Sequence, residues 1–248
     1  MCSVVILRRP GHDWPVLLAA NRDEMNDRPW LPPGRHWPER PWVVAGFDQQ
    51  AGGSWLGLND YGLLAGVMNR AGSLGPAAGK RSRGELVLEA LDHADALEAA
   101  KALGALEPRS YRPFNMMVAD NRDGFWIRNA DESIAVTPIA AGLSMLTAHD
   151  LNDEGGSRRI RHYLPLFRAA PAPDPAAGDW RAWQELLASS HFAAGGTPYD
   201  AMTIHEQSGF ETLSSALIAL PSPESESKPV FLFAPGRPDR TAYEIVTL

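Results

Sequence analysis

Short apolar segments joined by tight turns constrain the fold of this chain most strongly. Residues Cys2–Leu7 and Pro15–Ala20 flank a Pro-Gly turn, and Ser54–Leu58 and Gly62–Met68 flank the turn sequence Asn-Asp-Tyr-Gly. Tight turns join antiparallel strands, whereas parallel strands need long crossover connections. The pattern therefore predicts mainly antiparallel sheet and argues against a doubly wound parallel sheet.

Helical and strand patterns alternate along the rest of the chain. Apolar spacing predicts one long helix at about 83–106 and shorter helices near 157–168 and 179–193. The proline-rich stretch Pro29–Pro41 is expected to form a loop. Further strands are expected at Trp42–Ala45, Phe114–Ala119, Phe125–Asn129, Ser133–Thr137, Leu143–Thr147, Thr212–Leu220, Val230–Phe233 and Ala242–Val246. No low-complexity linker interrupts the chain, so the sequence predicts one α+β domain spanning residues 1–248.

Charge and cysteine content exclude several classes of partner. The 248 residues include 30 acidic and 23 basic ones, with no basic stripe that could neutralise a phosphate backbone, so nucleic acid is not expected as a partner. No apolar run reaches about 18 residues, so stable membrane insertion is not expected. The single cysteine excludes an internal disulfide and is typical of the reducing cytoplasm. We therefore expect a cytoplasmic protein with no metal or other cofactor, and a homo-oligomer is compatible with the sequence.

Several familiar motifs fail on spacing. The segment Gly75–Arg81 resembles a phosphate-binding loop, but Arg81 stands where Ser or Thr must hold magnesium. The segment that begins at Asp150 opens like a calcium loop, but its last ligand position is Arg161, which would repel the cation. Gly53-Ser54 lacks the second glycine of a nucleophile elbow, and no His-Glu-x-x-His pair occurs. The sequence supports none of these chemistries.

Cys2 is the remaining candidate nucleophile. Initiator methionine is efficiently removed when the second residue is small, so we expect Cys2 to become the first residue of the mature protein. It would then carry both a thiol and a free α-amine, each with an ordinary pKa within about two units of neutral pH. The amine can accept the thiol proton while the thiolate attacks an acyl carbon.

The tetrad Asn21-Arg22-Asp23-Glu24 follows the first predicted hairpin. Folding that hairpin about its turn makes paired residue numbers sum to about 23, so Cys2 is expected opposite Asn21. A guanidinium such as Arg22 would favour the thiolate, and a carboxylate such as Asp23 could anchor the ammonium or orient Arg22. The hairpin thus predicts that the tetrad and the thiol share a site.

Both features also have simpler interpretations. A lone cysteine is usually a small buried hydrophobe. A charged tetrad at the end of a strand is more often a solvated turn with local salt bridges. Together the two features favour catalysis more than either does alone.

The sequence resembles the NRDE family, which is named for the tetrad and includes the transport and Golgi organisation protein 2 homologues. Besides Cys2 and the tetrad, the likeness covers roughly the first half of the chain through Arg28-Pro29, Ala51-Gly52-Gly53-Ser54-Trp55-Leu56-Gly57, Gly66-Val67-Met68-Asn69-Arg70, Ser82-Arg83-Gly84 and Phe114-Asn115. The resemblance implies a four-layer α-β-β-α sandwich of mainly antiparallel sheets, of the N-terminal-nucleophile hydrolase type. More distantly, the chain is similar to the choloylglycine hydrolase and penicillin V acylase group, which cleaves linear amides with an N-terminal cysteine.

The resemblance implies catalytic roles near the chain start. Cys2 would be the nucleophile, and Arg22 and Asp23, with the neighbouring Asn21, would support it. The implied activity is hydrolysis of a linear carbon–nitrogen amide bond in a small-molecule substrate, through a thioester on Cys2.

Three residues further along the chain have implied roles as well. Asn69 would contribute to the hole that stabilises the tetrahedral oxyanion. Trp55 and Arg70 are expected to contact the substrate, with Trp55 as the floor of an acyl pocket. A strand-end asparagine that bonds its own turn is the alternative for Asn69, and core packing is the alternative for Trp55.

Two positions in the second half depart from the family pattern. Where a Ser-Asn or Thr-Asn is expected after a strand, this sequence has Thr147-Ala148, which removes the second oxyanion donor and leaves His149 and Asn152 as candidate substitutes. Near the C-terminus the family's Thr-Arg-Ser-Ser becomes Thr212-Leu213-Ser214-Ser215, which loses an arginine. Because a fold does not fix a function, the loss of these two groups bears on turnover rather than on the fold.

These departures favour an alternative function on the same scaffold, the non-catalytic binding or trafficking of an apolar ligand such as haem or an acyl lipid. An axial haem ligand would come from His12, His36 or His149. Each of these is more simply an ordinary surface histidine. No Cys-Pro haem motif is present.

Overall fold

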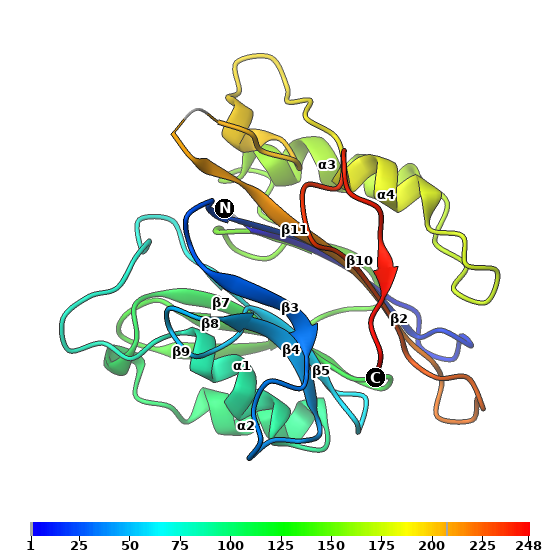
Figure 1. Cartoon of the computed structure of the whole chain (residues 1–248), viewed down its shortest axis with the longest axis horizontal. Helices are drawn as coiled ribbons and strands as arrows, with labels where there is room; N and C mark the ends of the chain where they lie inside the picture. The colour runs from blue at the N-terminus through cyan, green and yellow to red at the C-terminus, as the bar shows by residue number, and fades with distance from the viewer. Residues whose placement is uncertain (1, 207) are drawn as a thin grey trace. The chain divides into compact units, whose positions relative to one another are not determined.

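The computed structural model describes residues 2–206 and 208–248, and these form two compact units. The first unit combines Met1–Asp27 with Ala141–Val246, and the second combines Arg28–Ala140 with Thr247–Leu248. Each unit is built on one antiparallel sheet (Figure 1). The predicted α+β class is confirmed, whereas a single domain over 1–248 stays a prediction. The expected removal of Met1 lies outside the described residues.

The sheet of the first unit has the strand order β10-β1-β2-β11-β12-β13, with every neighbouring pair antiparallel. Its strands are β1 (Ser3–Arg8), β2 (Val16–Met25), β10 (Gly142–Leu146), β11 (Phe210–Leu220), β12 (Val230–Ala234) and β13 (Glu244–Ile245). Helices α3 (Arg158–Ala169) and α4 (Arg181–Leu187) cover one face of this sheet (Figure 1). Val5 and Leu17 pack against apolar residues of these helices, so odd-numbered residues of β1 and β2 face the helix layer.

The hairpin of β1 and β2 has a register one residue beyond the predicted one. Ser3 pairs with Asn21, whereas the sequence predicted Cys2 at that position. The connection is centred on His12, whose ring nitrogen accepts a hydrogen bond from Trp14 N at 3.0 Å. Because a shift of one residue exchanges the faces of a strand, Ser3 rather than Cys2 shares a face with Asn21.

Strand β2 is longer than predicted and contains the whole tetrad. It continues to Met25 because β11 pairs with it along its full length. Asn21, Arg22 and Asp23 are only 1%, 5% and 5% exposed. The tetrad is therefore an internal strand segment, and its interpretation as a solvated turn is wrong.

The sheet of the second unit has the order β3-β4-β5-β6-β7-β8-β9 and is also antiparallel. Its strands are β3 (Trp30–Gly34), β4 (Val43–Asp48), β5 (Leu56–Asn59), β6 (Leu64–Asn69), β7 (Phe114–Ala119), β8 (Gly124–Asn129) and β9 (Ile134–Pro138). Strand β3 lies in the stretch that was predicted to be a loop. Its two prolines are tolerated because β3 is an edge strand with an irregular register.

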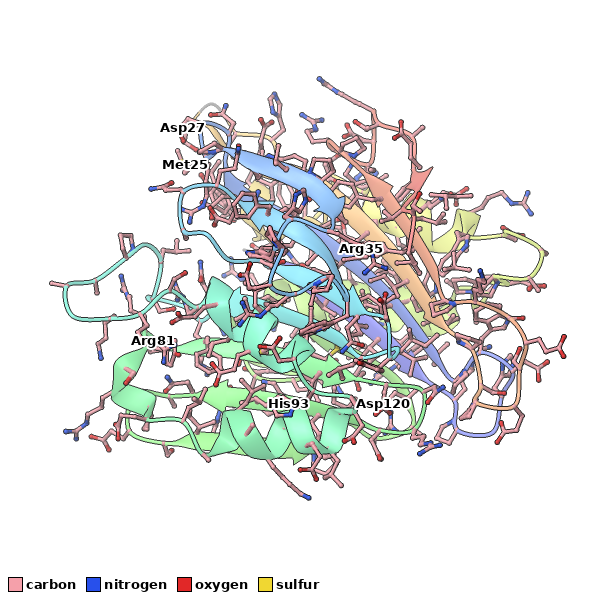
Figure 2. All side chains as sticks on the ribbon, turned by 60° about the horizontal axis from the view of Figure 1, so that its bottom comes forward. Met25, Asp27, Arg35, Arg81, His93 and Asp120 are labelled. Atoms are coloured by element: carbon pink, nitrogen blue, oxygen red, sulfur yellow. The ribbon has the colours of Figure 1, made fainter. Side chains whose placement is uncertain are left out.

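Two helices replace the single long helix predicted for 83–106. Short 3-10 turns also occur at Pro108–Ser110 and Pro198–Asp200. The two helices are α1 (Gly84–Leu91) and α2 (Ala96–Gly104). Asn59 Nδ2 donates to the carbonyl oxygen of His93 at 2.8 Å, and Asp120 Oδ2 accepts from Ala96 N at 2.8 Å, which fixes the break between them. His93 and Asp120 are labelled in Figure 2. No helix among the described residues is long and apolar enough to cross a membrane.

Close backbone contact between Gly53 and Gly84 joins two of the family-like segments. Ser54 N donates to the carbonyl oxygen of Gly84 at 2.9 Å. A Cβ on Gly53 would lie 2.6 Å from that oxygen, which is closer than real Cβ atoms approach. Position 53 therefore needs glycine at this point of contact.

We expect Gly53→Ala to lower the free energy of unfolding by about 1–3 kcal/mol, because backbone atoms of Gly84 must move. Urea unfolding followed by circular dichroism measures the change. Gly155→Ala is the control, since its Cβ would approach nothing closer than 3.4 Å. Its effect should stay within about 0.5 kcal/mol, and equal effects of the two substitutions would contradict the expectation.

Candidate active site

Cys2 lies immediately before β1, with its sulfur beside the tetrad. Its thiol donates to the backbone carbonyl oxygen of Asp23, with an Sγ to O distance of 3.7 Å. The residue is half-buried. The predicted proximity of Cys2 and the tetrad is therefore present, and the contact is made by the backbone of Asp23 rather than by its carboxylate.

The pleat of β2 sends the tetrad side chains alternately to the two faces of the sheet. Asn21 and Asp23 contact the segments on the helix-covered side, together with Ser3. Arg22 therefore points to the opposite face, and the alternation continued from Ser3 places Cys2 on that same face. The Arg22 guanidinium and the Cys2 thiol therefore share one face of the sheet, while the Asp23 carboxylate lies on the other face.

Asn21 contacts the helix layer. Its Nδ2 donates to the carbonyl oxygen of Leu187, at the end of α4, at 3.0 Å and to that of Met202 at 2.9 Å. Both amide hydrogens are thus used on the face opposite to Cys2. The structure gives Asn21 a contact that orders the unit, and its catalytic role stays a prediction.

Asp23 forms a buried ion pair with Arg159 of α3. Its Oδ2 lies 3.0 Å from Arg159 Nη1, and the two side chains are 0% and 3% exposed. Its Oδ1 accepts from Thr212 Oγ1 at 2.7 Å, and the same hydroxyl accepts from Ile204 N at 2.9 Å. The carboxylate is therefore held at both oxygens by residues from other segments.

Sequence reasoning missed Arg159 and assigned no role to Thr212. Thr212 could have been found, because it opens the segment compared with the family's Thr-Arg-Ser-Ser. Arg159 carries no such signal, because the helix there reads Arg-Arg-Ile-Arg and its neighbours Arg158 and Arg161 are exposed. Only the packing of α3 against the sheet singles out Arg159.

Burial raises the pKa of the Cys2 thiol above its ordinary value, and the negative charge of Asp23 raises it further. The hydrogen bond to the Asp23 backbone and the positive charge of Arg22 act in the opposite direction and do not offset the rise. A raised pKa keeps the thiol protonated at neutral pH, so the thiolate is scarcer than in an exposed cysteine. Nucleophilic attack therefore needs a base that removes this proton.

We expect alkylation of Cys2 by iodoacetamide to keep accelerating above about pH 9 in the chain that retains Met1, because only the thiolate reacts and its pKa is raised. Intact mass measures the rate, and the adduct is unambiguous because the chain has one cysteine. A short peptide with an exposed cysteine is the control and should level off near pH 9. A plateau for the protein at a lower pH than for the peptide would contradict the raised pKa.

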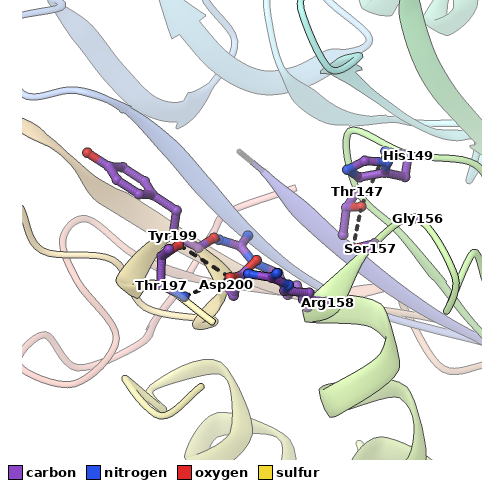
Figure 3. A pocket seen from close by; sticks show the side chains of 9 residues that line it. Thr147, His149, Gly156, Ser157, Arg158, Thr197, Tyr199 and Asp200 are labelled. Atoms are coloured by element: carbon purple, nitrogen blue, oxygen red, sulfur yellow. Dashed lines mark hydrogen bonds between the residues drawn. The ribbon is translucent and has the colours of Figure 1, made fainter. Parts of the chain in front are cut away.

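A cavity of about 310 Å³ lies at the start of α3, within the first unit (Figure 3). Its lining includes His149, Ser157, Arg158, Arg159, Tyr199 and Asp200. Its volume is at the lower end of the range for small-ligand sites. Because Arg159 lines the cavity and also contacts Asp23, the cavity adjoins the buried ion pair.

The other predicted site residues belong to the second unit. Asn69 ends β6 and pairs with Phe114, so it lies on the helix-covered face of that sheet. Arg70 Nη1 donates to Asn115 Oδ1 at 2.7 Å. Trp55 packs edge-on against another indole, that of Trp30, with ring centroids 5.8 Å apart. The oxyanion role of Asn69 and the substrate contacts of Trp55 and Arg70 stay predictions.

The two departures from the family pattern fall close to Cys2 and the ion pair. The register of β1 and β10, continued two residues beyond its last pair, reaches Ala148 opposite Cys2. Leu213 lies at an irregularity of β11 between the residues that pair with Asp23 and Arg22. Neither position can supply a side-chain amide or guanidinium.

Asn152 and His149, the candidate substitutes for the oxyanion donor that is missing at Ala148, have other surroundings. Asn152 Oδ1 accepts from Met145 N at 2.8 Å, and its Nδ2 donates to Ser144 Oγ at 3.2 Å. Its amide is therefore used along β10. His149 lines the cavity described above.

Two solved structures with a similar fold are an acylase and an amidase. Penicillin V acylase from Agrobacterium tumefaciens superposes over 95% of this chain and 83% of its own, with a TM-score of 0.57 and 16% identity. The Caenorhabditis elegans ortholog of N-acylethanolamine-hydrolyzing acid amidase superposes over 100% of both chains, with a TM-score of 0.58 and 14% identity. The expected N-terminal-nucleophile hydrolase fold is thereby confirmed. At these identities the likeness establishes the fold alone.

Sequence relatives identify the family. The bovine (Bos taurus) transport and Golgi organization protein 2 homolog is 37% identical over 111 residues, which are 42% of this chain and 38% of the bovine protein. The chain spans half or less of the length of the curated relatives it matches. The sequence profile of Transport and Golgi organisation 2 matches residues 1–168, well over half of the chain. The chain therefore belongs to the Transport and Golgi organisation 2 family.

Proposed function

We propose that this chain is an N-terminal cysteine hydrolase that cleaves linear carbon–nitrogen amide bonds. The observation that carries the proposal is the position of the only cysteine, at residue 2, with its Sγ against the backbone of the buried tetrad. The fold shared with an acylase and an amidase supports the same reaction class. The substrate is a small molecule, and a reducing cytoplasm would keep the thiol free.

The proposed reaction forms and then breaks a thioester. The Cys2 thiolate attacks the amide carbonyl carbon, and the electron pair of the C=O bond moves to oxygen. The tetrahedral intermediate collapses, the C–N bond breaks, and the amine leaves with the proton taken from the thiol. Water then attacks the thioester, which releases the carboxylic acid and restores the thiol.

The base in this proposal is the α-amine of Cys2, which becomes free when Met1 is removed. The raised pKa of the thiol makes such a base necessary at neutral pH. Arg22, on the same face, favours the thiolate by its charge. Asn69 is proposed as the oxyanion donor, and Trp55 and Arg70 as substrate contacts.

A second candidate is a non-catalytic carrier of haem or an acyl lipid. The observation that favours it is the absence of an amide at Ala148 and of a guanidinium at Leu213, both next to residues of the proposed site. A binding protein needs neither group. The two candidates differ in whether Cys2 is required.

Amine release from a panel of linear N-acyl amides tests the proposal. Wild type should release the amine, and Cys2→Ser should not. Both proteins are also titrated with haemin and with a fluorescent fatty acid. Tight binding of either probe by both proteins, with no amine released from any amide, would overturn the hydrolase and favour the carrier.

A further inference from the structure

The guanidinium of Arg159 donates hydrogen bonds to three residues, and two of them, Ser3 and Asp23, adjoin Cys2. Its Nη1 donates to Ser3 Oγ at 2.5 Å and to Asp23 Oδ2 at 3.0 Å, and its Nη2 donates to the carbonyl oxygen of Tyr199 at 2.8 Å. These partners belong to β1, to β2 and to the turn at 198–200. One side chain therefore connects three segments that are distant in sequence.

The start of α3 fixes where this side chain lies. Ser157 Oγ accepts from Ile160 N at 3.2 Å, which caps the helix and places Arg159 in its first turn. Arg159 is 2% exposed, whereas the adjacent Arg158 is exposed. The capped helix thus directs one of its arginines into the unit.

Stability alone does not account for a buried ion pair at this position. Removing a carboxylate and a guanidinium from water costs several kcal/mol per ion, and well-packed apolar residues often serve stability as well or better. A guanidinium that donates from both of its terminal nitrogens does give a fixed geometry that apolar contacts cannot impose. The pair between Arg159 and Asp23 is better explained by what it positions.

Both partners of Arg159 Nη1 belong to residues that adjoin Cys2 through the backbone. Ser3 follows Cys2 in the chain, and Asp23 supplies the backbone oxygen that the thiol contacts. We propose that Arg159 is a positioning residue for Cys2, which holds Ser3 and Asp23 in place and balances the charge of the Asp23 carboxylate. The positioning role itself does not depend on the proposed function; only the use of the positioned thiol as a nucleophile toward amides rests on it.

The charges around the thiol give the proposal a measurable consequence. Arg22 and Asp23 act on it from β2, Arg159 pairs with Asp23 from α3, and His149 lies in the cavity on α3's side. The negative charge of Asp23 raises the pKa of the Cys2 thiol. Without Arg159 this carboxylate loses the positive charge that lies 3.0 Å from it, so the thiol should be harder to ionise.

The test is the pH profile of Cys2 alkylation by iodoacetamide in the full chain. The variants are Arg159→Gln, which removes the charge, and Arg159→Lys, which keeps the charge but loses the planar fork. Arg161→Gln is the matched control, because Arg161 is an exposed arginine of the same helix. Circular dichroism establishes that each variant is folded.

Arg159→Gln should move the midpoint of the profile upward by roughly one pH unit, and Arg161→Gln should leave it unchanged. Arg159→Lys should keep the midpoint but lower the plateau rate by about tenfold, because the thiol is no longer held in place. A folded Arg159→Gln variant with the wild-type profile would overturn the proposal. If Arg159→Gln does not fold, Arg159→Lys decides, and a wild-type midpoint and plateau together would overturn it.

This readout separates the inference from the proposed function. Alkylation requires a positioned thiol but no amide substrate. A shifted profile without amine release from any amide would leave the role of Arg159 standing and remove the hydrolase. Amine release together with an unshifted profile would support the hydrolase and overturn the positioning role of Arg159.

Discussion

Asp23→Asn is expected to lower the free energy of unfolding by about 3–5 kcal/mol, because it removes the carboxylate that pairs with the buried Arg159 guanidinium. The carboxylate side chain is 0% exposed. Asparagine also keeps the size of the side chain, so the effect reports the charge rather than a cavity.

Urea unfolding at neutral pH measures this loss. Asp27→Asn is the control, because Asp27 is an exposed carboxylate just beyond β2 and should change stability by no more than about 0.5 kcal/mol. The double variant Asp23→Asn with Arg159→Met should be less destabilised than the sum of its two single variants, since it removes both charges. Additive losses, or an Asp23→Asn effect as small as that of the control, would refute the coupling.

Cys2→Ser is expected to slow acyl transfer from an activated ester such as p-nitrophenyl acetate by about 10³-fold or more. A serine hydroxyl ionises far less readily than a thiol and is a much weaker nucleophile at neutral pH. The substitution changes one atom of a half-buried residue, so the fold should survive.

Stopped-flow release of p-nitrophenolate measures the rate, with Asp27→Asn again as the control. The control should react at the wild-type rate, because its side chain is exposed and lies in the loop after β2. Equal rates for wild type and Cys2→Ser would mean that another group accepts the acyl chain.

Local patterns predicted the hairpins well, because turn sequences and short apolar strand segments can be recognised within a few residues. Strand β7 was predicted with its observed bounds, Phe114–Ala119. The break between α1 and α2 was missed because Asn59 and Asp120 impose it from other parts of the second unit. Strand β3 was missed because pairing with β4 overrides its two prolines.

The candidate site could be predicted only in part, because some of its contacts join segments that are distant in sequence. Cys2 and the tetrad belong to one hairpin, so their proximity follows from sequence even though the register was one residue off. Arg159 and Thr212 reach Asp23 across sequence separations of 136 and 189 residues. No local pattern can reveal contacts of that range, and in the case of Arg159 the neighbouring exposed arginines conceal it.

The intact mass of the purified protein after brief exposure to p-nitrophenyl acetate tests the central claim most directly. The account predicts a chain that lacks Met1 and carries one acetyl group, mapped to Cys2 by peptide mass and absent from Cys2→Ser. A chain that retains Met1 quantitatively and takes up no acetyl group at Cys2 would contradict it.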